Sequence, residues 1–258
     1  MPRIHPTAIV DPGAKLADDV EVGPLSCIGP GVELGAGVVV GSQVSLLGQT
    51  RVGPRTRIHP FAAVGGDPQD KSFAGERTRL EIGADNVIRE HATIHVGTPQ
   101  GGGCTRIGDD NLIMNSAHVA HDCQVGSHVI VASFVGLAGH VVVEDHAVLG
   151  AYTGVHQFAR VGESVMTAAN SMLSQDAPPF AMVAGDRARL VGLNVVGVRR
   201  RGLSEEAVSA LKRAFHLLFA SKLRLDVAIA RIRDELPDAP EVERLLRFLE
   251  RSTRGFCR

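Results

Sequence analysis

Two histidines and an aspartate lie close together in residues 115–122, whose sequence is Asn-Ser-Ala-His-Val-Ala-His-Asp. His118 and His121 are three residues apart, and Asp122 directly follows His121. A histidine beside a carboxylate can act as a general base near neutral pH. The same residue types also bind zinc or form hydrogen bonds at turns, so their spacing leaves all three roles open. The absence of an HExxH motif and of any CxxC pair disfavours zinc.

Aliphatic residues recur every six positions around this stretch. The series runs from Ile4 to Val64, resumes from Ile82 to Ile94, and resumes again from Ile107 to Val161. A second small or branched residue precedes most of these aliphatics by two positions, and residues two apart on a strand face the same side. Three hexads make one triangular coil of 18 residues, and stacked coils bury their aliphatic residues against one another. The periodicity predicts a parallel β-helix over residues 1–190.

Glycine often follows the repeated aliphatic residue, as at Gly23, Gly41 and Gly126. We expect these glycines to form corners that need permissive backbone angles. The six-residue phase is lost twice, near 66–79 and 97–106, in polar segments rich in glycine and proline. We expect both segments to be loops ejected from the coil. Loops on a rigid scaffold often carry function, and the alternative is that each loop is a tolerated insertion.

The 18-residue coil places chemistry-bearing residues in one column. Val119, Leu137 and Val155 are repeated aliphatic residues spaced one coil apart. The residues two positions after them are His121, Gly139 and Gln157. Neighbouring coils lie about 4.8 Å apart, so His121 and the adjacent pair Gly139 and His140 can touch one substrate. A glycine N–H at a tight corner can stabilise an oxyanion. Asp122 can orient the imidazole or point away from it.

The repeat fades after Val161, and residues 191–258 show helical patterns instead. We expect a small helical domain there, with helices near 204–218, 225–235 and 242–251, capping the open end of the β-helix. Lys and Arg number 13 against 19 Asp and Glu through Val198, which gives −6, and 14 against 9 from Arg199 onward, which gives +5. A basic terminal segment indicates an anionic partner such as phosphate or an acidic protein, or else a solvated helical surface.

Composition narrows the class of protein. The chain is 44% hydrophobic and 21% charged, with 29 glycines and no tryptophan, which is typical of a globular protein with a narrow interior. Its four cysteines are scattered, as expected for free thiols in a reducing compartment. The N-terminus lacks a signal-peptide pattern, and the apolar stretch 129–143 is too short to cross a bilayer. We expect a cytoplasmic protein without membrane insertion and without a nucleic-acid partner.

Several motifs resemble those of the UDP-N-acetylglucosamine O-acyltransferase family, within the hexapeptide-repeat acyltransferase superfamily. They are HPTA at 5–8, QD at 69–70, AGE at 74–76, TIH at 93–95, QGGG at 100–103, AHVAHDC at 117–123, LAGH at 137–140, VHQF at 155–158, RRG at 200–202 and RSTRG at 251–255. The resemblance implies a left-handed β-helix and a homotrimer with sites between subunits. It also implies transfer of a 3-hydroxyacyl group from acyl carrier protein to the 3-hydroxyl of UDP-N-acetylglucosamine, the first step of lipid A biosynthesis, without cofactor or metal.

The resemblance further implies roles for individual residues. His121 is expected to deprotonate the sugar hydroxyl, with Asp122 beside it and the Gly139 N–H stabilising the oxyanion. The expected substrate-binding residues are Asp70, His118 and His140 at or near the sugar, His156 and Gln157 against the substrates, Asn194 near the nucleotide, and Arg200 and Arg201 at phosphates or the carrier protein. Ala169 lies where the family measures acyl-chain length, often with glycine. Its added methyl group predicts preference for a shorter chain.

Two other functions remain as alternatives at this point. One is a metal-dependent hydratase on the same β-helix, resembling the gamma carbonic anhydrases, which the C-terminal helical segment and the RSTRG ending disfavour. The other is a non-catalytic β-helical scaffold, which would not need His121. Within the acyltransferase hypothesis, the acceptor is either a sugar hydroxyl or a 3-amino sugar, and Asp70 and His118 favour the hydroxyl by resemblance.

Overall fold

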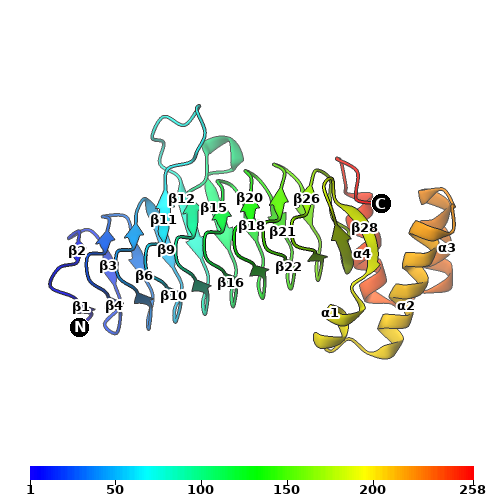
Figure 1. The fold of residues 1–258 in the computed structure, drawn as a ribbon, viewed down its shortest axis with the longest axis horizontal. Helices are drawn as coiled ribbons and strands as arrows, with labels where there is room; N and C mark the ends of the chain where they lie inside the picture. Colours follow the sequence, from blue (N-terminus) through cyan, green and yellow to red (C-terminus); the bar gives the residue numbers. More distant parts are fainter.

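A computed structural model describes all 258 residues and shows a long β-helix with helices packed at one end (Figure 1). The strands form three sheets. The first sheet holds β1 (Arg3–Ile4), β4 (Glu21–Val22), β7 (Val39–Val40), β10 (Arg57–Ile58), β13 (Val87–Ile88), β16 (Leu112–Ile113), β19 (Ile130–Val131), β22 (Val148–Leu149), β25 (Met166–Thr167), β27 (Ala181–Ala184) and β28 (Arg189–Leu193).

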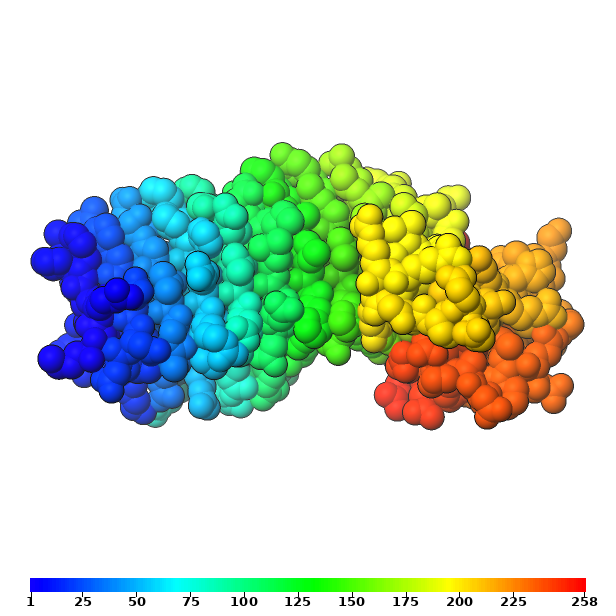
Figure 2. Space-filling view, turned by 90° about the horizontal axis from the view of Figure 1, so that it is seen from below, coloured from blue at the N-terminus to red at the C-terminus, as the bar shows by residue number.

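The second sheet holds β2 (Ile9–Val10), β5 (Cys27–Ile28), β8 (Ser45–Leu46), β11 (Ala63–Gly66), β14 (Thr93–His95), β17 (His118–Val119), β20 (Gly136–Leu137), β23 (Gly154–Val155) and β26 (Met172–Leu173). The third sheet holds β3 (Lys15–Leu16), β6 (Glu33–Leu34), β9 (Gln49–Val52), β12 (Arg79–Ile82), β15 (Cys104–Ile107), β18 (Gln124–Val125), β21 (Val142–Val143) and β24 (Arg160–Val161). Each coil contributes one strand to each sheet, so residues close in sequence stay close along the long axis (Figure 2).

The observed register confirms the predicted 18-residue coil. His118 pairs with Gly136, and Gly136 pairs with Gly154, in parallel. The repeated aliphatics and the residues two before them form one continuous buried core, as predicted. The first coil is the exception: Ile4 is 41% exposed and Val10 and Leu16 are only partly buried, because no coil stacks beneath them.

The prediction that glycines supply unusual backbone angles at the corners was wrong. Most corners do contain a residue with positive φ, but it is the third residue after the aliphatic, such as Asp122 at 61° or His140 at 62°. The glycines directly after the aliphatics have ordinary φ, with Gly65 as an exception. A Cβ at Gly53 would lie 2.4 Å from the carbonyl carbon of Gly83 on the next coil. Glycine is needed there because stacked corners leave no room for a side chain.

Both predicted loops leave the coil on the same side of the β-helix (Figure 1). The first connects β11 to β12. The second connects β14 to β15 and contains the 3₁₀ turn η1 (Pro99–Gly101). It is shorter than predicted, because β15 already begins at Cys104 and pairs over four residues with β12.

The C-terminal segment is helical, as expected. It contains α1 (Val195–Arg200), α2 (Glu205–Phe215), the π-helical turn η2 (His216–Ala220), α3 (Leu225–Glu235) and α4 (Pro240–Glu250). None of these helices has the length and apolarity needed to cross a membrane. The segment also binds the last coils, since Ser252 donates a hydrogen bond of 2.8 Å to the buried carboxylate of Asp176. The division into domains 1–190 and 191–258 stays a prediction.

Candidate active site

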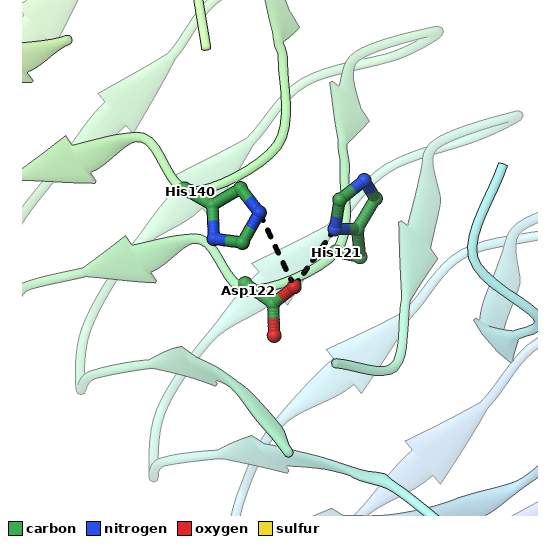
Figure 3. Close-up of side chains that lie close together, drawn as sticks. All are labelled: His121, Asp122 and His140. Atoms are coloured by element: carbon green, nitrogen blue, oxygen red, sulfur yellow. Dashed lines mark hydrogen bonds and ion pairs between the residues drawn. The ribbon is translucent and has the colours of Figure 1, made fainter. Parts of the chain in front are cut away.

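His121 and Asp122 lie at the corner that follows β17. The strand register places His121, Gly139 and Gln157 in one column, as the sequence predicted. In Figure 3 the side chains of His121, Asp122 and His140 converge on one point at this edge. The corner therefore brings a possible base, a carboxylate and a second imidazole together from two adjacent coils.

The Asp122 carboxylate points at His121, which resolves the orientation that the sequence left open. Asp122 Oδ2 lies 2.8 Å from His121 Nδ1. The Asp122 side chain is 1% exposed and that of His121 is 14% exposed. Because Nδ1 donates its proton to the carboxylate, Nε2 keeps the free lone pair that a general base needs.

Gly139 lies directly against the His121 ring. A Cβ there would stand 2.6 Å from His121 Cε1 and 2.8 Å from Nε2, so any larger residue would displace the imidazole. The Gly139 N–H has no hydrogen-bond partner within the protein. A free N–H on a residue that contacts the base can stabilise an oxyanion.

His140 packs between the His–Asp pair and the next coil. Its Nε2 is 3.7 Å from Asp122 Oδ2, and its ring meets that of His121 edge-on at 5.2 Å. On its other side it stacks on Phe158 at 4.4 Å. His140 thus contacts the candidate base and competes with His121 for the same carboxylate oxygen.

A second pair of histidines comes from β17, which leads into the His121 corner, and from β14 on the preceding coil. His118 Nδ1 is 2.7 Å from Thr93 Oγ1, and its ring is 5.0 Å from that of His95. Burial lowers the pKa of His118, and burial together with the charges of His118 and His121 lowers the pKa of His95 to about 4. His95 is therefore neutral near pH 7, which suits hydrogen bonding to an uncharged sugar. Its buried Nδ1 has no partner in the protein. We did not predict His95 as a site residue, although it ends the TIH motif.

Asp70 lies in the loop between β11 and β12, where it accepts hydrogen bonds from the Ser72 N–H and hydroxyl, both at 2.9 Å. These bonds lower the pKa of Asp70, and the charges of His121 and His140 act in the same direction. The ejected loop therefore holds Asp70 near enough to the histidine corner for their charges to interact.

His156 and Gln157 lie one coil beyond Gly139 and are exposed. His156 Nδ1 is 3.0 Å from the Gln157 carbonyl and 3.2 Å from Arg254 of the RSTRG segment. His156 also lines a cavity of about 370 Å³ together with Met172 and Arg187. This cavity lies further along the helix axis than the candidate base, and neither His121 nor Gly139 lines it.

Four predicted residues lie away from this corner in the single chain. Ala169 is exposed beyond β25, on the first sheet. Asn194 caps α1 by accepting from the Gly197 N–H at 3.0 Å and donating to the Ser164 carbonyl at 3.0 Å. Arg201 pairs with Glu163, and Arg200 is exposed. One chain does not bring these residues to His121.

The His121, Asp122 and His140 group is also the candidate metal centre. Its possible ligand atoms lie within 4.8 Å of one another. Ligand atoms around tetrahedral zinc stand about 3.3 Å apart, given bonds of about 2.0 Å. The 2.8 Å separation of Nδ1 and Oδ2 is instead that of a hydrogen bond, and Oδ2 also accepts the Thr98 hydroxyl at 2.6 Å. The donor set fits a hydrogen-bonded pair better than a zinc site.

The β-helix and its histidine corner define an acyltransferase of the hexapeptide-repeat class. A family model described as bacterial transferase hexapeptide matches residues 104–139, and one described as UDP N-acetylglucosamine O-acyltransferase, domain 2, matches residues 176–257. Curated proteins named acyl-[acyl-carrier-protein]–UDP-N-acetylglucosamine O-acyltransferase match over the full length of both chains, with 52% identity in Thiobacillus denitrificans and 48% in Myxococcus xanthus. This chain belongs to the UDP-N-acetylglucosamine O-acyltransferase family.

Solved structures agree with this assignment. LpxA from Acinetobacter baumannii is 44% identical with a TM-score of 0.96, and UDP-N-acetylglucosamine O-acyltransferase from Moraxella catarrhalis RH4 is 40% identical with a TM-score of 0.96. Each match covers 99% of both chains. The predictions of a left-handed parallel β-helix and of an acyltransferase are confirmed.

Proposed function

We propose that this protein transfers a 3-hydroxyacyl group from acyl carrier protein to the 3-hydroxyl of UDP-N-acetylglucosamine, the first step of lipid A biosynthesis. One observation carries the chemical part of the proposal: the imidazole of the hydrogen-bonded His121–Asp122 pair packs directly against Gly139, whose N–H has no partner in the protein. The names of the full-length relatives support both substrates.

The reaction follows from the atoms at this corner. His121 Nε2 accepts the proton of the sugar hydroxyl as its oxygen attacks the thioester carbon. The Gly139 N–H then stabilises the oxyanion of the tetrahedral intermediate. Collapse breaks the C–S bond, and His121 returns the proton to the departing thiolate of the carrier protein. Asp122 stabilises the charged imidazolium between these transfers, and a general base of this kind contributes about 10²–10⁴ in rate.

The residues around His121 bind the sugar in this proposal. Asp70 is an anionic acceptor for sugar hydroxyls, and His118 and His95, whose pKa values are lowered, offer neutral hydrogen-bonding groups. His140, His156 and Gln157 complete the edge along which the two substrates meet. We propose a hydroxyl acceptor, with a 3-amino sugar as the outcome that would refute it.

We further propose a cytoplasmic homotrimer with sites between subunits. The support is that Ala169, Asn194, Arg200 and Arg201 lie away from His121 within one chain. The net charge of +5 from Arg199 onward suits contact with nucleotide phosphates or an acidic carrier protein. Light scattering gives the oligomeric state. Mixed trimers of His121→Ala and Arg200→Ala chains should recover part of the activity if sites are shared, and should recover none if each site belongs to one chain.

The direct test is incubation of purified protein with UDP-N-acetylglucosamine and a panel of 3-hydroxyacyl carrier proteins, with product mass read out. We expect a product carrying one added acyl group as an ester. The exposed methyl of Ala169 predicts preference for a shorter donor than glycine-bearing relatives use. An unmodified sugar nucleotide with every donor would refute the function, and stoichiometric zinc in the purified protein would favour a hydratase instead.

A further inference from the structure

The glycine-rich segment 98–103 contacts the Asp122 carboxylate but takes no part in the proton transfers described above. Thr98 donates to both carboxylate oxygens, through its N–H to Oδ1 at 2.8 Å and through its hydroxyl to Oδ2 at 2.6 Å. A Cβ on Gly101 would stand 1.9 Å from Asp122 Cγ. We propose that Thr98 is a positioning residue that directs the Asp122 carboxylate to His121, with Gly101 closing over it.

Two hydrogen bonds from one residue fix the plane of the carboxylate. Oδ1 is occupied by the Thr98 N–H, and Oδ2 is shared by the Thr98 hydroxyl and His121 Nδ1. The nearest competing donor is His140, whose Nε2 is 3.7 Å from the same Oδ2. A rotation of the carboxylate toward His140 would break both bonds to Thr98. Thr98 therefore decides which histidine holds the carboxylate.

The direction of the Thr98 hydroxyl is set by the turn that it begins. Its Oγ1 faces the Gly101 N–H at 3.2 Å, and a backbone N–H can only donate. The single hydroxyl proton is thus left for Asp122. The segment is itself held in place, because the Thr98 carbonyl accepts the Gly103 N–H at 2.8 Å and the Gly103 carbonyl accepts the Arg79 N–H at 3.0 Å. Thr98 is 2% exposed, so water does not replace these bonds.

The test compares Thr98→Val with Thr98→Ser in the full-length protein. Valine keeps the shape but loses the hydroxyl, and a hydrogen bond to a charged group corresponds to about 10- to 100-fold in rate. We expect kcat to fall by that factor with KM for both substrates within about twofold, and serine to recover most of the turnover. Thr56→Val is the matched control, since Thr56 is fully buried and hydrogen-bonded at another corner. It should leave kcat unchanged.

A double-mutant cycle identifies the route by which Thr98 acts. If Thr98 works through Asp122, Thr98→Val should change turnover by less than about twofold in an Asp122→Asn background. The same factor of loss in both backgrounds would overturn the inference, as would a loss confined to KM or a serine variant as poor as valine. The inference rests on the proposed function, and the two fail differently. An unmodified sugar nucleotide with every donor refutes the function, and full turnover in His121→Ala refutes the general-base role. A His121-dependent enzyme indifferent to Thr98→Val refutes only the positioning role.

Discussion

Two corners of the β-helix hold a histidine and an aspartate at almost the same separation. At the corner after the second sheet, His121 Nδ1 is 2.8 Å from Asp122 Oδ2. At the corner after the third sheet, His128 Nδ1 is 2.9 Å from Asp110 Oδ2. The side chains of the first pair are 14% and 1% exposed, and those of the second are 50% and 64% exposed.

The two corners also share their backbone. Asp122, His128 and Asp110 all have φ between 53° and 61°. What differs is the covering: segment 98–103 closes over Asp122, whereas Asp110 and His128 face solvent. An exposed pair of this kind contributes little because water competes for both partners. The repeat thus builds many equivalent corners, and an insertion turns one of them into a site.

The largest expected effect on kcat comes from replacing the buried carboxylate of Asp122, compared with the exposed carboxylate of Asp110. Asp122→Asn can donate its amide to Nδ1 of His121, which leaves the proton on Nε2 and removes the base. We expect kcat to fall about 10²-fold or more, while Asp110→Asn at the exposed corner stays within about twofold of wild type. Steady-state assays of both variants decide it. Equal activity of the two would end the distinction between the corners.

The next largest effect on kcat is expected from Gly139, which packs against the His121 imidazole. Gly139→Ala places a methyl group 2.6 Å from His121 Cε1 and must push the ring aside. A misplacement of about 1 Å can cost about 10²-fold, and we expect a loss of that order in kcat. Asp145 occupies the corresponding position at the other corner, so Asp145→Ala is the control and should retain activity. Wild-type turnover in Gly139→Ala would contradict the observed contact.

A smaller loss is expected from the covering segment. Gly101→Ala forces a methyl group into the Asp122 carboxylate, at 1.9 Å from Cγ. We expect about a tenfold fall in kcat and a lower Tm, since overpacking costs about 1–3 kcal/mol. Thermal melts and turnover on the same preparation measure both. An unchanged kcat would show that the segment covers Asp122 without holding it.

The smallest effect is on the free energy of unfolding and concerns the buried His95. The pKa of His95 is lowered to about 4 in the folded protein, so the unfolded chain binds more protons between about pH 6.5 and 4. Stability should therefore fall as the pH drops through this window. His95→Gln should reduce the slope by up to about 1.4 kcal/mol per pH unit. Urea titrations from pH 7 to 4.5 test this, and identical slopes in wild type and His95→Gln would contradict it.

The parts of the structure that follow the repeat could be predicted from sequence. The core positions, the column of His121, Gly139 and Gln157, and the two ejected loops follow from a fixed period of six. Helix α3 was also predicted at its observed bounds, because its apolar stripe follows the helical period.

The remaining features could not be predicted, because they depend on segments and contacts that do not follow the six-residue repeat. The contact of Thr98 with Asp122 depends on the path of the segment inserted between β14 and β15. His95, at the end of β14, is buried at the start of the same insertion. Sequence also did not distinguish a glycine needed for positive φ from one needed for close stacking, as at Gly53. The roles of Ala169, Asn194, Arg200 and Arg201 rest on resemblance and stay predictions.

The central claim is that His121 is the base, and turnover of His121→Ala beside His128→Ala tests it most directly. Both variants remove a histidine that faces an aspartate at a β-helix corner, so both should fold and assemble like wild type. With UDP-N-acetylglucosamine and a 3-hydroxyacyl carrier protein, His121→Ala should lose about 10²–10⁴ in kcat, and His128→Ala should stay within about twofold. Near-normal turnover in folded His121→Ala would contradict the account.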